Sequence, residues 1–111
     1  MTPTSADGLV LVYITTPDKA EALRIGKALV EKRLAACVNA WEGMTSLYWW
    51  EGKIADSSEA VLIAKTTASR IGTITQVVRA FHSYSVPCVL SFPVSAGNPD
   101  YEKWLRENLG D

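Results

Sequence analysis

The chain has 111 residues and a formal net charge of -1, with 11 Lys and Arg side chains against 12 Asp and Glu. This length predicts a single domain over residues 1–111, large enough to fold without disulfides or a structural metal. The near-neutral charge argues against a nucleic-acid partner, and no apolar run is long enough to predict a membrane span. Residues 1–7 are expected to be disordered and carry no signal-peptide pattern, so we expect a cytoplasmic protein.

A buried strand and a helix are expected at the start of the chain. The continuous apolar run 9–14 is typical of a strand that is buried on both faces. Thr16 then suits a helix N-cap and Pro17 the first helical position, so a helix is expected over about 17–33. The outer face of this helix is expected to carry the charged residues Lys19, Glu21, Arg24, Lys27, Glu31 and Lys32.

A long β-hairpin is expected next. The extended stretches 35–41 and 44–50 are separated at Gly43, which indicates a bulge or a bend within one strand. Glu51-Gly52 suits a two-residue hairpin turn, because glycine tolerates the positive φ that such turns need. The return strand is expected over 53–66 and ends in a buried apolar run.

The rest of the chain completes an α+β pattern. A second helix is expected over 68–82 and a last core strand over 88–94. Asn98 and Pro99 form an N-cap and first-turn pair, which predicts an extra C-terminal helix. The order βαββαβ predicts a ferredoxin-like sandwich, with two helices on one face of an antiparallel sheet and the first and third strands in its middle.

The hairpin is too long for the body that carries it. Residues 35–50 as one strand would span about 53 Å, whereas a domain of this size has a radius of gyration of about 13 Å. The projecting part has apolar side chains on both faces, which would be unstable and adhesive in water. Either the strand bends at Gly43 and folds back on its own core, or the arm pairs with neighbouring subunits. We expect the second arrangement, a homo-oligomer.

Three functions of ferredoxin-like domains lack their residues here. Soft-metal chaperones need thiolates in the first loop, but residues 15–18 contain no cysteine. RNA-binding versions stack bases on aromatic residues of the central strands, and the stretch 60–64 has none. Acylphosphatase-like enzymes need Arg and a backbone cradle, yet neither Arg nor Gly occurs between Ile14 and Lys19. One histidine and no paired nucleophile predict a protein that is not an enzyme.

Two segments carry a family resemblance. Residues 34–39 (LAACVN) and 46–54 (SLYWWEGKI) resemble the CutA family of divalent-cation tolerance proteins, and further similarity runs from about 9 to 109. The resemblance implies a homotrimer similar in architecture to the PII signalling proteins, with ferredoxin-like subunits. It also implies a role in copper tolerance, weak binding of divalent copper-like cations and no organic cofactor.

The resemblance also implies site residues. By position, Cys37 and His82 match the strand cysteine and turn histidine of the family and are the expected metal ligands. The expected lining of an inter-subunit cleft consists of Lys65, Tyr84, Tyr48 and Trp50. The turn departs from the family pattern His-Pro-Tyr-Glu-Val-Pro-Glu, because Ser83, Ser85 and Cys88 replace the proline and both glutamates.

Several residues allow two interpretations. His82 either ends the second helix or binds copper or zinc together with Cys88, or with Cys37 of a neighbouring copy. Within one subunit the two cysteines are expected at opposite sheet edges, too far apart to share an ion. Lys65 either binds an anion in the cleft or lies on the surface.

Two functions from different classes follow. The first is a CutA-like homotrimer that binds copper-like cations between subunits and serves the response to metal ions. The second is a PII-like signalling or scaffold module that binds a small anionic ligand or a protein partner in the cleft. Convergence of Cys37 and His82 would favour the metal, and convergence of Lys65 with backbone donors would favour the anion.

Overall fold

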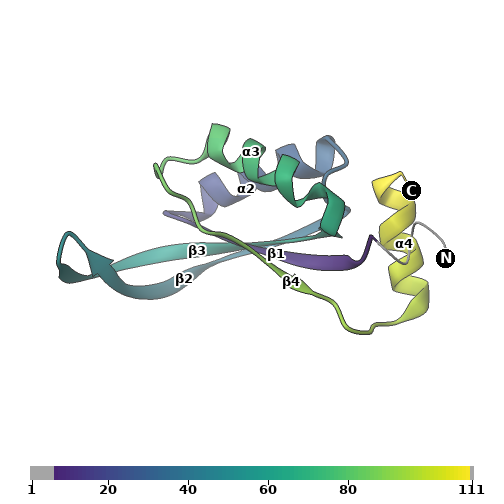
Figure 1. Ribbon diagram of the computed structural model, residues 1–111. Helices are drawn as coiled ribbons and strands as arrows, with labels where there is room; N and C mark the ends of the chain where they lie inside the picture. The colour runs from purple at the N-terminus through teal and green to yellow at the C-terminus, as the bar shows by residue number, and fades with distance from the viewer. Residues whose placement is uncertain (1–6, 111) are drawn as a thin grey trace.

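A four-stranded antiparallel sheet forms the base of the fold in the computed structural model, which describes residues 7–110 (Figure 1). The strands are β1 (Leu9–Thr16), β2 (Cys37–Trp50), β3 (Lys53–Thr67) and β4 (Val89–Pro93). Their order across the sheet is β2-β3-β1-β4, so the first and third strands lie in the middle as predicted. This α+β topology confirms the ferredoxin-like arrangement.

Two helices, α2 (Lys19–Glu31) and α3 (Ile71–Phe81), lie on one face of the sheet, and a third, α4 (Pro99–Leu109), lies at one end of it (Figure 1). A 3₁₀ turn over Ala68–Arg70 leads into α3. The predicted cap of α4 is confirmed, because the Asn98 side chain accepts a hydrogen bond from the Asp100 N–H at 3.1 Å.

The start of α2 differs from the sequence prediction. Pairing of β1 with β3 continues through Thr16, so this residue belongs to the strand and is not the N-cap. The cap is Asp18, whose Oδ1 accepts a hydrogen bond from the Glu21 N–H at 2.8 Å. Pro17 therefore lies before the helix, which begins at Lys19.

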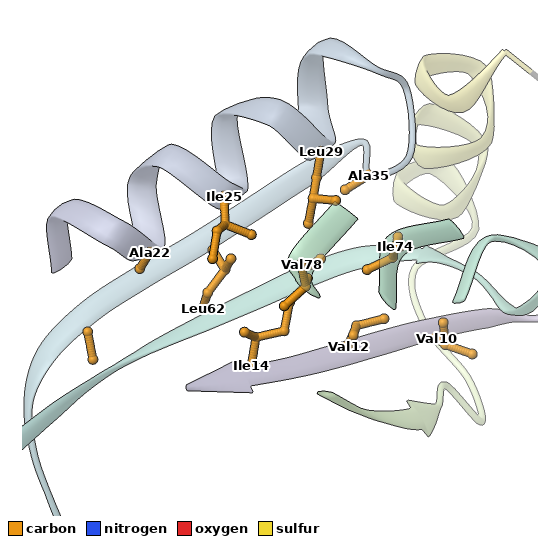
Figure 2. Packing of buried hydrophobic residues seen from close by; sticks show 12 residues of the cluster. Val10, Val12, Ile14, Ala22, Ile25, Leu29, Ala35, Leu62, Ile74 and Val78 are labelled. Carbon is orange, nitrogen blue, oxygen red and sulfur yellow. The ribbon is translucent and has the colours of Figure 1, made fainter. Parts of the chain in front are cut away.

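The hydrophobic core lies between the two helices and the sheet (Figure 2). It includes the buried residues Val10, Val12, Ile14, Ala22, Ile25, Leu29, Ala35, Leu62, Ile74 and Val78. A Cβ at Gly26 would lie 3.0 Å from Val38 Cγ2 and 3.1 Å from Leu62 Cδ1, so this glycine lets α2 approach the sheet closely.

Burial on the two faces of the sheet is unequal. In β1, Val10, Val12 and Ile14 are buried under the helices, whereas Leu11 and Tyr13 on the other face are only half-buried. The prediction of a strand buried on both faces is therefore wrong for one subunit. The open face is continued by exposed apolar residues of the edge strands, Trp41, Leu90 and Phe92.

The hairpin formed by β2 and β3 projects from the body as an arm (Figure 1). The register shifts between Trp41 and Met44, and Gly43 has a φ of 89°, which confirms the predicted bulge. Glu51 and Gly52 both take positive φ in the turn. The molecule is 50 Å long but only 25 Å by 23 Å across, so the arm does not fold back on the core.

The N-terminal residues 1–6, which the sequence predicts to be disordered together with Asp7, lie outside the described residues. Asp7 itself is held in place. Its carboxylate accepts hydrogen bonds from the backbone N–H of Ser69 at 2.9 Å and from the Ser69 hydroxyl at 2.8 Å.

Candidate functional site

A cavity of about 650 Å³ lies where the arm joins the sheet. Its aromatic lining consists of Tyr48, Trp50 and Tyr84, and its polar lining includes Thr15, Ser46, Ser57, Glu59, Ser85 and Cys88. Because Thr15 alternates with the core-facing Ile14, the cavity opens on the sheet face away from the helices. We call this space the arm cavity.

Strand register places the arm residues of the cavity on one face. Ser46 pairs with Ser57, and Tyr48 lies two residues further along β2. Since side chains alternate along a strand, residues two apart share a face. The segment 83–88, which links α3 to β4, brings Tyr84 and Cys88 to the same face and closes the other side of the cavity.

A hydrogen bond across the arm cavity joins Tyr84 to Glu59. The Tyr84 hydroxyl donates to Glu59 Oε2 at 2.9 Å. Burial, together with this hydrogen bond and the negative charge of Glu59, raises the pKa of Tyr84 to about 12. The phenol therefore stays protonated at neutral pH and remains a donor to the carboxylate.

The Cys88 thiol lines the arm cavity and is half-buried. Burial raises the pKa of Cys88, the negative charge of Glu59 adds to this shift, and a hydrogen bond with Thr15 opposes it. A thiol that stays protonated is a weak ligand for a metal ion, because the thiolate is the binding form.

The His82 side chain is fully buried and bridges three parts of the chain. One ring nitrogen, Nε2, lies 2.7 Å from the Thr15 carbonyl oxygen, which can only accept, so Nε2 carries the proton. The other, Nδ1, accepts the Tyr84 backbone N–H at 3.0 Å. Both ring nitrogens therefore have protein partners, and neither offers a free lone pair to a metal ion in this arrangement.

Glu21 is a residue that sequence reasoning placed on the outer face of the helix, and that placement is wrong. Its side chain is buried, and Oε2 accepts hydrogen bonds from the Ser83 N–H and hydroxyl, both at 3.0 Å. The same oxygen lies 3.3 Å from His82 Nδ1. The capping-box spacing of Asp18 and Glu21 is the sequence signal that marks this residue as part of the first turn.

Lys65 does not line the arm cavity of its own chain. It pairs with Cys37 across β2 and β3, and its Nζ donates to the Tyr101 hydroxyl of α4 at 3.1 Å. This hydrogen bond to the Tyr101 hydroxyl raises the pKa of Lys65. The structure thus brings together Tyr48, Trp50 and Tyr84 from the predicted cleft, while Lys65 lies near α4.

The two predicted metal ligands lie apart in one subunit. Cys37 pairs with Lys65 of β3, which in turn pairs with Leu11 of β1. His82 bonds instead to the carbonyl oxygen of Thr15, which lies four residues after Leu11 in β1. Four residues of a strand span about 13 Å. Within residues 7–110, no three or more His, Cys, Asp and Glu side chains form a group that could hold a metal ion.

The two cysteines flank the sheet as predicted. Cys37 begins the edge strand β2, and Cys88 precedes β4 at the other edge.

Among the described residues no helix has both the length and the apolar character needed to cross a membrane.

Comparisons with known proteins identify a family. Residues 10–108 match the model of the family described as CutA1 divalent ion tolerance protein. A protein of Thermus thermophilus named divalent-cation tolerance protein CutA is 45% identical over 100 residues, covering 90% of this chain and 97% of its own length. The chloroplastic protein CutA 1 of rice is 40% identical, and the match covers 89% of this chain but 56% of the rice protein.

Solved structures agree with this match. A structure described as a periplasmic divalent cation tolerance protein CutA of Archaeoglobus fulgidus has a TM-score of 0.88 and 40% identity, covering 91% of this chain and 98% of that one. The structure of the Thermus thermophilus protein has a TM-score of 0.87 and 44% identity, and the match covers 90% of this chain and 97% of that one.

Proposed function

Because the chain belongs to the CutA family of divalent-ion tolerance proteins, we propose that it binds divalent, copper-like cations weakly as a homotrimer and contributes to metal-ion tolerance. The match over residues 10–108 carries this proposal, since relatives of nearly the same length are named for that role. We further propose a cytoplasmic location and a role without catalysis, on the sequence grounds given above.

The open sheet face and the arm support assembly. Trp41, Leu90 and Phe92 are about half exposed on the sheet face away from the helices. On the arm, Leu47 and Trp49 are each 73% exposed. Exposed apolar surface of this extent is typical of interfaces between subunits, so two further copies would shield it from water.

The proposed copper site needs groups from two copies. Cys37 is half-buried, and among residues 7–110 its thiol makes a single hydrogen bond, a long one of 3.9 Å to the Val38 carbonyl oxygen, so it has capacity for a ligand. His82 would have to give up its bond to Thr15 or to Tyr84 to present a nitrogen. This cost fits weak rather than tight binding. Thiolate with imidazole favours copper or zinc over calcium or magnesium.

Calorimetric titration with Cu(II) tests the proposal. We expect binding by the wild-type protein to weaken at least tenfold in Cys37→Ser and in His82→Gln. Cys88→Ser, which removes the other thiol, is the matched control and is expected to bind as the wild type does. Light scattering on each sample checks the trimer. Binding that survives both ligand substitutions would reject these two residues as the site.

A second candidate function is supported by the arm cavity itself. Three of the four residues predicted to line a cleft meet there, and the cavity has the size of a small-molecule site. A PII-like module would use it for a small ligand or a partner segment. Because Lys65 lies elsewhere in its own chain, an anionic ligand would depend on a basic group from a neighbouring copy.

A further inference from the structure

We propose that the arm cavity accepts a small organic cation, with an ammonium group held by Glu59 among the aromatic rings of Tyr48, Trp50 and Tyr84. This inference rests on the second candidate function, that of a small-ligand module, and it names the class of ligand. It replaces the anion expected from the sequence with a ligand of the opposite charge.

The charge of Glu59 has no partner of opposite sign. Within residues 7–110, the Glu59 carboxylate accepts one hydrogen bond, which comes from the neutral hydroxyl of Tyr84. No Lys, Arg or His of these residues forms an ion pair with the carboxylate. None of the residues that line the cavity is basic. Glu59 is partly buried, and a bound cation would supply the counter-charge that this carboxylate lacks among the described residues.

The geometry of Tyr84 leaves part of the carboxylate for a ligand. The phenol donates to Oε2 and stays protonated, because its pKa is raised to about 12 by burial and by Glu59. The other oxygen, Oε1, has no hydrogen-bond donor among the described residues. The positive charge of an ammonium group beside this oxygen would be attracted by the negative charge of the carboxylate, whether or not the group carries an N–H.

The aromatic lining suits the same class of ligand. A cation within about 6 Å of an aromatic ring centre is attracted by the negative face of the ring, and tryptophan gives the largest effect. Trp50 is 61% exposed and Tyr48 is 41% exposed, so neither ring is covered by its own chain. Their hydrophobic faces would also shield the alkyl part of an amine.

The lining fits a metal ion or an anion less well. For a metal ion it offers one carboxylate, neutral hydroxyls and the Cys88 thiol, whose pKa is raised by burial. For an anion it offers no positive charge. An organic cation uses both the carboxylate and the rings, and therefore matches more of the lining than either alternative.

The test is calorimetry of the whole protein with choline, and with its uncharged isostere 3,3-dimethyl-1-butanol. We expect choline to bind at least tenfold more tightly than the alcohol. Glu59→Gln, which keeps an acceptor for the Tyr84 hydroxyl, should weaken choline binding at least tenfold and leave alcohol binding unchanged. Asp56→Asn removes an equal charge from the opposite face of β3 and should change neither.

Three results would overturn the inference. The first is equal affinity for choline and the alcohol, and the second is tighter binding of inorganic phosphate than of choline. The third is no choline binding combined with loss of the oligomer in Glu59→Gln, which would mean that a Lys or Arg of a second copy supplies the cation. Cys37-dependent copper binding by the wild-type protein does not depend on any of these results, so failure here is distinct from failure of the metal function.

Discussion

At the scale of single residues, the helical pattern of the sequence does not predict that Glu21 is buried. It adjoins the apolar stripe that contains Ala22 and Ile25, and in the sequence it is one of several charged residues on the same helix. Its burial depends on Ser83 and His82, which come more than sixty residues later and donate to it or lie beside it. Only tertiary contacts of this kind distinguish it from its solvated neighbours.

The candidate site shows the same limit. Tyr48, Trp50 and Tyr84 could be predicted from motif resemblance, and they do meet in one cavity. The sequence pattern does not mark Glu59 as a site residue, because its partner Tyr84 is distant in the sequence and a lone Glu in a strand is usually solvated. The resemblance places Lys65 in a cleft between subunits, and this stays a prediction. Within its own chain, Lys65 donates to the Tyr101 hydroxyl at the end of the sheet near α4.

Cys88 provides a prediction about pH. Burial raises the pKa of its thiol, so at a given pH the folded protein contains less thiolate than the unfolded chain. In the Cys37→Ser background, where Cys88 is the one thiol left, iodoacetamide should therefore react more slowly with the folded protein at pH 8. The midpoint of the rate against pH should lie above that of the same protein in urea.

The raised pKa of Cys88 also makes the free energy of unfolding depend on pH. A thiol whose pKa is raised by folding stabilises the folded state fully below the pKa of the unfolded thiol. That contribution is lost as the pH rises through the higher folded value. A reaction midpoint at or below that of the unfolded chain would contradict the burial of Cys88.

At the scale of elements, the sequence predicts the type of each helix and strand better than its ends. Apolar residues that recur every 3.6 residues predict α2 and α3, and continuous apolar runs predict the central strands. Both patterns mark the faces that must be buried. The start of α2 is displaced because Thr16 and Asp18 are both good cap residues, and pairing of β1 with β3 decides between them. The apolar residue Phe81 is 49% exposed, because it lies in the last turn of α3.

Two glycines provide a matched prediction about backbone conformation. Gly43 has a φ of 89° at the bulge of β2, where an alanine would be strained, so Gly43→Ala should lower the free energy of unfolding by about 1–2 kcal/mol. Gly72 lies in α3 with negative φ and no atom near an added Cβ, so Gly72→Ala should raise it by about 0.5–1 kcal/mol.

Urea unfolding of both variants at one fixed protein concentration measures these changes, because assembly makes stability depend on concentration. If Gly43→Ala is as stable as the wild type, the bulge can relax and the positive φ is not required. If Gly72→Ala is less stable, the neighbourhood of Gly72 is more crowded than the structure shows.

At the scale of the whole molecule, the arm and the open sheet face both leave apolar side chains in contact with water. One subunit buries the helix-facing side of its sheet but leaves the other side and both faces of the arm partly in water. The sequence predicts the projecting arm, because residues 35–50 as one strand would extend beyond the body. It does not predict the open sheet face, because the apolar run 9–14 indicates burial on both faces. The way in which copies would cover the surface depends on shape, which a pattern of residue types does not encode.

Trp49 tests the role of the arm in the proposed trimer. It is 73% exposed near the arm tip, and large aromatic residues dominate the free energy of such interfaces. Trp49→Ala and Trp50→Ala should therefore shift light-scattering mass at low micromolar concentration from three chains toward one. Trp104→Ala is the control, because Trp104 lies in α4, at the opposite end of the molecule (Figure 1). If both arm variants remain trimeric, the arm is not what holds the copies together, and the sheet face would have to supply the contact.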